Sequence, residues 1–250
     1  MHDRERPVAM RLLLLSNSTA PGRGYLEHAT DVLRDTLSGV RRLVFVPFAL
    51  ADHDDYTRKV AEALAPLGVE VLGAHQGDPL ALLDSAQAVF VGGGNTFRLL
   101  KRLHATGLVT AINAAVRAGT VYIGSSAGTN VACPTVRTTN DMPIVQPPSL
   151  DAVGLVPFQI NPHYLDPLPD STHMGETREE RLVQFLEEND GPVLGMREGT
   201  WLVRAEDTLT LGGTAAGARL FRRGQEPAEI ATGTDLSWLL DTRTRYDAGA

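Results

Sequence analysis

The 250-residue chain has a single cysteine, Cys133, and few aromatic residues, which make up 6% of the sequence. One cysteine excludes an intramolecular disulfide framework and a zinc site built from several cysteines. No uninterrupted apolar run of about 18 residues occurs, so no membrane-spanning helix is predicted. Positive charge is also scarce: 23 Lys and Arg stand against 30 Asp and Glu, which gives a net charge of −7. This balance argues against a nucleic-acid-binding protein, because such proteins must neutralise phosphates.

What is present has the composition of an ordinary globular protein, with 43% hydrophobic and 21% charged residues. The length allows one large domain with its own core. We expect a single domain over residues 1–250, with flexible ends at residues 1–9 and from about residue 242. The apolar run at residues 12–15 is too short for a secretory signal, which needs roughly 7–15 apolar residues. We therefore expect a cytoplasmic protein without a membrane anchor.

Short apolar runs alternate with helical patterns in the first half of the chain. The runs at residues 12–15, 43–47, 69–72, 88–91 and 120–123 are predicted strands, and apolar residues between them recur at helical spacing. Continuous apolar strands separated by helices predict a mostly parallel sheet with helices on both faces. The expected fold class is therefore α/β, a three-layer αβα sandwich. In such folds functional residues gather at the carboxyl ends of the strands.

The second half of the chain has a different pattern. Residues 134–175 are rich in Pro, Thr, Asn and Asp, which predicts long ordered loops, and a helix is predicted over residues 176–189. Short strands separated by turns are then predicted at residues 193–196, 200–203, 208–211 and 219–222. Such short strands are typical of antiparallel hairpins, so we expect a mixed sheet with antiparallel C-terminal strands.

A serine occupies a predicted strand-to-helix turn. Residues 124–128 read Gly-Ser-Ser-Ala-Gly, which matches G-x-S-x-G, and they lie between the predicted strand and a helix predicted over residues 126–132. This is the context of a nucleophile elbow, in which a sharp turn exposes the serine hydroxyl and requires small neighbours. Ser126 is the candidate nucleophile, and Ser125 is a weaker one because it precedes the centre of the pattern. A Gly/Ser-rich turn without chemistry is the alternative.

A glycine-rich loop follows the predicted strand at residues 88–91. Residues 92–95 read Gly-Gly-Gly-Asn and are followed by neither Gly-Lys-Ser/Thr nor a G-x-G-x-x-G pattern, so a nucleotide site is disfavoured. An oxyanion hole is the better hypothesis, because it needs one N–H just after the nucleophile and one from a neighbouring loop. Ala127 supplies the first, and Gly93 or Gly94 the second. Asn95 is a candidate substrate contact, and a tight turn without function is the alternative.

A serine nucleophile needs a general base and a group that orients it. Of seven histidines, His163 follows an apolar stretch that ends at residues 161–162, which is a strand-end position. The orienting carboxylate is either Asp141, in a loop downstream of the serine, or Glu198, at a turn between two predicted strands. Each is also compatible with a plain turn residue or a substrate contact. No cluster of His and Cys has metal-ligand spacing, so no metal is expected.

Together these segments resemble peptidase E, the α-aspartyl dipeptidase family of serine peptidases. The resemblance runs from about residue 10 to residue 240, and its motifs are residues 92–97, 124–128, 132–144, 159–164 and 175–181. The spacing is specific, with 37 positions from residue 126 to 163 and 35 from 163 to 198. The resemblance implies a flavodoxin-like fold similar to class I glutamine amidotransferases. It also implies hydrolysis of dipeptides with an N-terminal aspartate, without metal or cofactor.

The resemblance also assigns roles to residues. It makes Ser126 the nucleophile and His163 the base, and it places Asp141 and Glu198 on carboxylates of the family pattern, with Glu198 favoured as the orienting group. The chain departs from the family at Ser125, where members have a bulky aromatic residue. We expect this small residue to leave room beside the nucleophile.

Arg178 is the candidate for recognising the substrate's aspartate side chain. The planar guanidinium of arginine suits a carboxylate better than any other side chain does. In the predicted helix over residues 176–189, Arg178 lies about 20° from Phe185 around the axis, so it projects along the apolar face. Arg181 and Arg137 are the next candidates.

The sequence therefore predicts a serine dipeptidase that cleaves Asp-Xaa dipeptides through an acyl-enzyme. Its expected partner is a small peptide substrate, with no cofactor, nucleic acid or membrane, and a homodimer is an option. The alternatives are a serine peptidase or esterase of broader specificity and a non-catalytic amidotransferase-like binding module. A glutaminase would need cysteine at the elbow, and Cys133 lies seven residues after Ser126. In α/β-hydrolase esterases the histidine usually lies near the C-terminus, whereas the last one here is His173.

Overall fold

Seven strands form the main sheet, in the order β3-β2-β4-β5-β1-β8-β9. The computed structural model describes residues 10–167 and 174–248. The first five strands in this order pair in parallel, and β8 and β9 continue the sheet in antiparallel fashion beside β1. The bounds are β1 (Arg11–Leu15), β2 (Arg42–Val46), β3 (Glu70–Gly73), β4 (Ala88–Val91), β5 (Val121–Ser125), β8 (Thr200–Ala205) and β9 (Thr208–Gly213).

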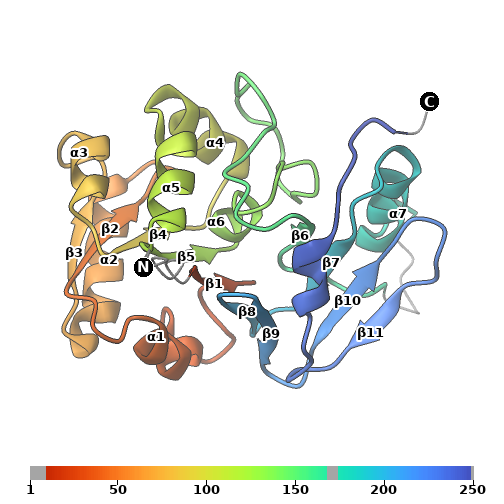
Figure 1. The fold of residues 1–250 in the computed structure, drawn as a ribbon, viewed down its shortest axis with the longest axis horizontal. Helices are drawn as coiled ribbons and strands as arrows, with labels where there is room; N and C mark the ends of the chain where they lie inside the picture. Colours follow the sequence, from red (N-terminus) through yellow and green to blue (C-terminus); the bar gives the residue numbers. More distant parts are fainter. Residues whose placement is uncertain (1–9, 168–173, 249–250) are drawn as a thin grey trace, which may run out of the picture.

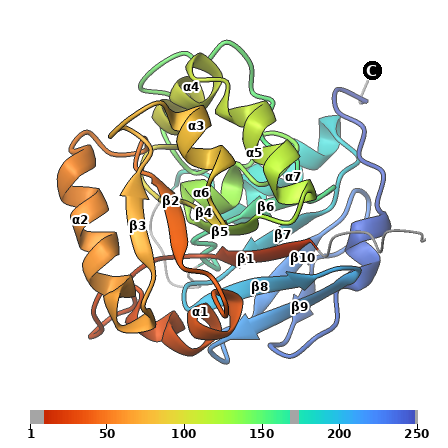
Figure 2. The ribbon, with the colours of Figure 1, turned by 60° about the vertical axis from the view of Figure 1, so that its left-hand side comes forward.

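Successive side chains of the parallel strands enter two different cores. In β1, Leu12 and Leu14 belong to one core, and Leu13 and Leu15 belong to the other. The first core is covered by α3 (Pro79–Asp84), α4 (Thr96–Ala105) and α5 (Leu108–Arg117), and the second by α1 (Thr30–Thr36) and α2 (His53–Leu64) (Figure 2). Burial on both faces explains why these strands are unbroken apolar runs in the sequence. The predicted α/β fold with a mostly parallel sheet is confirmed.

A smaller sheet of four strands, in the order β11-β10-β7-β6, lies beside the main one (Figure 1). Its strands are β6 (Gln159–Asn161), β7 (Val193–Met196), β10 (Ala218–Phe221) and β11 (Ala228–Ile230). One face packs against α7 (Arg178–Glu188) through Leu182 and Leu186. From the other face Leu194 and Met196 join the core of the main sheet. The two sheets therefore share the first of the two cores, the one that contains Leu12 and Leu14.

The structure corrects the pairing of the C-terminal strands. We expected a single mixed sheet, and β8 and β9 do extend the main sheet as an antiparallel pair. However, β7 and β10 pair with each other in the smaller sheet, together with β6, the strand that ends just before His163. The apolar pattern of a strand shows that it is buried but not which strand it pairs with, because pairing depends on the tertiary fold.

The remaining elements lie close to their predicted positions or were not predicted. Helix α7 begins at Arg178 rather than at residue 176, because the Thr177 side chain caps it and Glu180 completes a capping box. The helix expected over residues 126–132 is the short α6 (Ala127–Asn130). Helix α3, strand β11 and the 3₁₀ helix η3 (Ser237–Asp241) were not predicted. The 3₁₀ helices η1 (Glu27–Ala29) and η2 (Ala65–Leu67) lie in segments whose apolar residues recur at helical spacing.

The C-terminal segment is hydrogen-bonded to the rest of the fold as far as it is described. The Thr244 hydroxyl donates to the Pro157 carbonyl, and the Asp247 carboxylate forms an ion pair with Arg137 at 2.6 Å. Residues 1–9 and 249–250, at the ends expected to be flexible, lie outside the described residues. The single domain and its flexible ends stay predictions. Within residues 10–167 and 174–248, no helix is both long and apolar enough to cross a membrane.

Candidate active site

Ser126 connects the end of β5 to the start of α6 in a strained conformation. Its φ of 54° and ψ of −110° lie outside the regions that non-glycine residues usually adopt. The small neighbours are a steric requirement: a Cβ on Gly124 would lie 2.6 Å from the Gly128 carbonyl oxygen, and one on Gly128 would collide with the Val91 carbonyl. The G-x-S-x-G pattern thus forms a sharp turn that presents the serine at the carboxyl end of β5.

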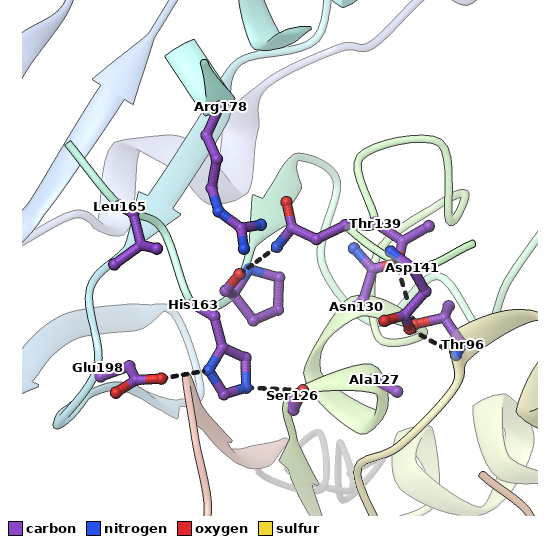
Figure 3. A pocket seen from close by; sticks show the side chains of 12 residues that line it. Thr96, Ser126, Ala127, Asn130, Thr139, Asp141, His163, Leu165, Arg178 and Glu198 are labelled. Atoms are coloured by element: carbon purple, nitrogen blue, oxygen red, sulfur yellow. Dashed lines mark hydrogen bonds and ion pairs between the residues drawn. The ribbon is translucent and has the colours of Figure 1, made fainter. Parts of the chain in front are cut away.

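His163 lies between Ser126 and Glu198 (Figure 3). Its Nε2 is 3.0 Å from the Ser126 Oγ, and its Nδ1 is 2.7 Å from the Glu198 Oε1. A carboxylate can only accept a hydrogen bond, so Nδ1 carries the proton and Nε2 is free to accept the serine proton. The arrangement has the geometry of a Ser-His-carboxylate triad.

Two residues just after β1 hold the segments that carry the histidine and the glutamate. The Ser16 Oγ accepts a hydrogen bond from the His163 N–H and donates one to the Met196 carbonyl, both at 2.9 Å. The Asn17 Oδ1 accepts from the N–H of Gly199, the residue after Glu198, at 2.7 Å. Both side chains are buried. Sequence reasoning missed this pair, although two polar residues directly after a buried strand are a signal of a site.

Asp141 lies on the other side of Ser126 and has a different contact. Its Oδ2 accepts a hydrogen bond from the Thr96 N–H, at the start of α4, at 2.7 Å. No hydrogen bond joins Asp141 to His163 in the described part of the chain, and both nitrogens of the imidazole already have partners. Of the two carboxylates left open by the sequence, Glu198 is therefore the one in position to orient the imidazole.

Some backbone N–H groups near Ser126 are free to donate a hydrogen bond to a substrate, and others already have an acceptor. Ala127 is the first residue of α6, so its N–H has no acceptor within the helix. The Gly93 N–H donates to the Tyr56 hydroxyl at 2.8 Å. No acceptor for the Gly94 N–H occurs among the described residues. Gly93 lies against the nucleophile, since a Cβ there would be 3.0 Å from the Ser126 Cβ.

Asn95 does not lie where a substrate contact was expected. Its Oδ1 accepts from the Arg98 N–H as the N-cap of α4, and its Nδ2 donates to the Met142 carbonyl at 2.9 Å. Because both ends of the amide are used within the protein and the residue lines neither cavity beside Ser126, Asn95 fixes the loop that carries Asp141. A Gly-Gly-Gly-Asn sequence before a helix is a good N-cap signal, which outweighs the substrate-contact hypothesis.

The other candidate nucleophiles are buried. Ser125 is fully buried, its hydroxyl has no hydrogen-bond partner in the described residues, and it lines neither cavity beside Ser126. The room that we expected beside the nucleophile therefore does not open into these cavities. Burial also raises the pKa of the Cys133 thiol to about 12, which keeps it protonated and unreactive.

Two cavities meet at the nucleophile, and Ser126, His163 and Asp141 line both of them. The first has a volume of about 330 Å³ and also contains Arg178, which reaches in from the first turn of α7 (Figure 3). The second, of about 630 Å³, extends past Tyr56 toward α2. A substrate bound across Ser126 can therefore place one part in each cavity.

Arg178 has no ionic partner among the described residues. Its guanidinium forms no hydrogen bond there, and its Nη1 is buried. Burial lowers the pKa of Arg178, and the charge of Arg181 acts in the same direction, whereas Asp141 and Glu198 raise it. An arginine remains charged under all ordinary conditions, so this cavity contains a positive charge that no side chain of the described residues pairs with.

The described residues contain no group of three or more His, Cys, Asp or Glu side chains that could hold a metal ion. The side chains that meet at Ser126 have the chemistry of nucleophilic acyl transfer: a hydroxyl, an imidazole, a carboxylate and free backbone N–H groups.

The sequence of the chain matches known proteins over most of its length. The model of the family described as Peptidase family S51 matches residues 12–212. Peptidase E of Streptomyces coelicolor is 64% identical over 241 residues, which cover 96% of this chain and 99% of that protein. Peptidase E of Citrobacter koseri is 50% identical over 228 residues, which cover 90% of this chain and 99% of that protein.

Solved structures have the same fold. A putative peptidase E protein from Listeria monocytogenes superposes with a TM-score of 0.63 at 23% identity, over 83% of this chain and 100% of that one. A peptidase from an acI-B1 actinobacterium superposes with a TM-score of 0.66 at 17% identity, over 92% of this chain and 97% of that one. At these sequence identities the superpositions show a shared fold and nothing about function.

Proposed function

Because the chain belongs to peptidase family S51, and is therefore a serine-type peptidase, we propose that it hydrolyses the peptide bond after an N-terminal aspartate in Asp-Xaa dipeptides. The observation that carries the substrate assignment is the guanidinium of Arg178 in the cavity beside Ser126, which has no partner among residues 10–167 and 174–248. A partly buried cation without a partner is costly. The side-chain carboxylate of a bound aspartate would satisfy it with two parallel hydrogen bonds.

In the proposed reaction Ser126 is the nucleophile and His163 the general base. The Ser126 Oγ attacks the scissile carbonyl carbon while the His163 Nε2 takes the hydroxyl proton. Glu198 accepts the Nδ1 hydrogen bond and stabilises the imidazolium that forms. His163 then gives the proton to the leaving amine, which departs as the second amino acid. A water molecule, deprotonated by His163, hydrolyses the acyl-enzyme and regenerates Ser126.

The negative charge on the tetrahedral intermediate needs N–H donors. We assign this role to the Ala127 N–H together with Gly94 or Gly93. The Gly94 N–H is the more available of the two, since Gly93 donates to Tyr56, and a substrate oxygen at Gly93 must share or replace that hydroxyl.

We further propose that the protein acts on small peptides in the cytoplasm without a nucleic-acid partner. The net charge of −7 supports the absence of a nucleic-acid partner. The two cavities support a substrate of two residues, with the aspartate beside Arg178 and the second residue on the Tyr56 side. A homodimer is compatible with these features.

The test compares hydrolysis of Asp-Leu, Ala-Leu and Asp-Leu-Gly by the wild type and by Arg178→Ala. Loss of a charge-assisted hydrogen bond should lower kcat/KM for Asp-Leu about 10- to 150-fold, and for Ala-Leu far less. Labelling of Ser126 by a fluorophosphonate probe should persist, which shows that the site is intact.

Arg181→Ala is the matched control, because Arg181 is an exposed arginine one turn away on the same helix. It should leave the preference for Asp-Leu unchanged. An Arg178→Ala protein that keeps the full preference would disprove the assignment of Arg178. A wild type that cleaves Ala-Leu as well as Asp-Leu would disprove the aspartate specificity itself.

A further inference from the structure

Asp141 is a carboxylate at the nucleophile to which the proposed reaction gives no role. It lines both cavities that meet at Ser126. It cannot orient the imidazole, because Glu198 and Ser126 occupy both ring nitrogens. In the described residues Asp141 forms no ion pair, although its charge raises the pKa of Arg178 across the cavity. Its only hydrogen bond there as an acceptor comes from the Thr96 N–H to Oδ2. Within the described part of the chain, the other carboxylate oxygen of Asp141 therefore has no partner.

The position of Asp141 is fixed without any cation. The Thr96 N–H is the first of α4, where the helix dipole favours a negative charge. The Asp141 N–H donates to the Thr139 hydroxyl, and Asn95 binds the carbonyl of the next residue, Met142. These bonds hold the charge in the cavity wall before any ligand arrives, which reduces the entropic cost of binding a cation there.

Asn130 offers a second unused acceptor in the same cavity. Its Nδ2 donates to the Ile160 carbonyl at 2.9 Å, and a carbonyl can only accept, so the orientation of the amide is determined. The Asn130 Oδ1 is buried and has no hydrogen-bond partner in the described residues. Buried polar atoms in native proteins nearly always have one, so an unsatisfied atom at a cavity wall points to a ligand.

We propose that Asp141, together with the Oδ1 of Asn130, binds the free α-ammonium group of the substrate's first residue. An ammonium has three N–H donors and no acceptor, so it matches a carboxylate oxygen and an amide oxygen. In Figure 3, Arg178 enters the cavity from α7, whereas Asp141 and Asn130 lie on the side of α4 and α6. The cavity therefore has a cation, Arg178, for the side-chain carboxylate of an N-terminal aspartate. It has an anion, Asp141, on a different side for the α-ammonium group of the same residue.

This inference rests on the proposed peptidase function and sharpens it. It makes the enzyme dependent on an unblocked N-terminus, since an acylated first residue has no ammonium for Asp141. The charge of the carboxylate, rather than its hydrogen bond to Thr96, would then be what substrate recognition needs.

The experiment compares Asp-Leu with succinyl-Leu, which is the same molecule without the ammonium group. For the wild type, kcat/KM should be about 10- to 150-fold higher for Asp-Leu. Asp141→Asn removes the charge and keeps an oxygen for the Thr96 N–H. It should lower kcat/KM for Asp-Leu by a similar factor and leave succinyl-Leu unchanged or slightly faster, so that the ratio approaches one.

Asp78→Asn is the matched control, because the Asp78 carboxylate also accepts a hydrogen bond from a backbone N–H in the first turn of a helix, α3, and it lines neither cavity. It should leave both rates unchanged. The proposal is overturned if Asp141→Asn slows both substrates by the same factor, or if the wild type does not distinguish them. Measuring Ala-Leu against propionyl-Leu separates the two proposals: a preference for Ala-Leu that Asp141→Asn abolishes supports ammonium binding even if the aspartate specificity fails.

Discussion

The two sheets contribute two halves of the site that differ in how they are held. The main sheet supplies Ser126 and the N–H of Ala127, which are consecutive residues of one turn. The close packing around Gly124 and Gly128 determines the shape of this turn. The segments around the smaller sheet supply His163 and Glu198 from positions 35 residues apart. The nucleophile therefore depends on local backbone geometry, whereas the base depends on tertiary contacts.

Ser16 and Asn17 connect the two halves. They follow β1 of the main sheet, and each makes a hydrogen bond to a backbone N–H of the other half, at His163 and at Gly199. Both of these residues have a positive φ, 52° for His163 and 80° for Gly199, which is unusual for a histidine. The difference between the halves suggests that mutations at the elbow and at the connection will fail in different ways.

The largest loss of activity is expected at Ser126, in the half of the site that local backbone geometry determines. Ser126→Ala should reduce kcat for Asp-Leu by about 10⁶, because the loss of a triad nucleophile costs this much in a comparable enzyme. Ser125→Ala is the control: its hydroxyl makes no hydrogen bond in the described residues, so the change should cost little. Hydrolysis rates and fluorophosphonate labelling measure both. A reversal of the two effects would show that the nucleophile has been misassigned.

The next largest loss of activity is expected at Glu198, in the half of the site that tertiary contacts hold. Glu198→Gln should reduce kcat by up to about 10⁴, because an amide in this position holds the wrong tautomer of the imidazole in the best-studied serine protease. Asp141→Asn, the same change at the other carboxylate, should reduce kcat/KM by only about 10- to 150-fold. Steady-state kinetics of both variants decide between them. A Glu198→Gln enzyme with wild-type kcat would disprove the orienting role of Glu198.

The same contrast explains how far the sequence could predict the molecule. The parallel strands were predicted and are confirmed, because strands buried on both faces are continuous apolar runs in the sequence. The family was predicted from the order and spacing of its motifs, and it is confirmed as well. The roles of Ser126 and His163 were proposed from local patterns, and the structure brings both together with Glu198. They stay predictions until tested.

Features that depend on distant partners could not be predicted. Nothing in residues 193–196 shows that β7 pairs with β6 and β10 rather than with the main sheet. The hydroxyl of Ser16 is an ordinary serine in the sequence, and only the fold brings it to the backbone of His163. Likewise, the choice between Asp141 and Glu198 needed the distances to the imidazole.

The smallest of these effects is expected where the two halves meet. Ser16→Ala leaves the His163 N–H and the Met196 carbonyl without their partner, which should destabilise the fold by about 1–3 kcal/mol. It should also let the imidazole shift, and a misplacement of about 1 Å can cost roughly 10²-fold in rate. We therefore expect kcat to fall about 10- to 100-fold while KM changes little, because Ser16 lines neither cavity.

Thr244→Val separates positioning from stability. It also removes a hydroxyl that donates to a backbone carbonyl, that of Pro157, but Thr244 does not contact His163. Thermal unfolding and kcat measured on both variants give the result: a similar loss of Tm with a kcat loss only in Ser16→Ala means that Ser16 positions the base. Equal kcat in the two variants would mean that Ser16 does not position His163 relative to Ser126. The hydrogen bonds of Ser16 would then contribute to stability alone.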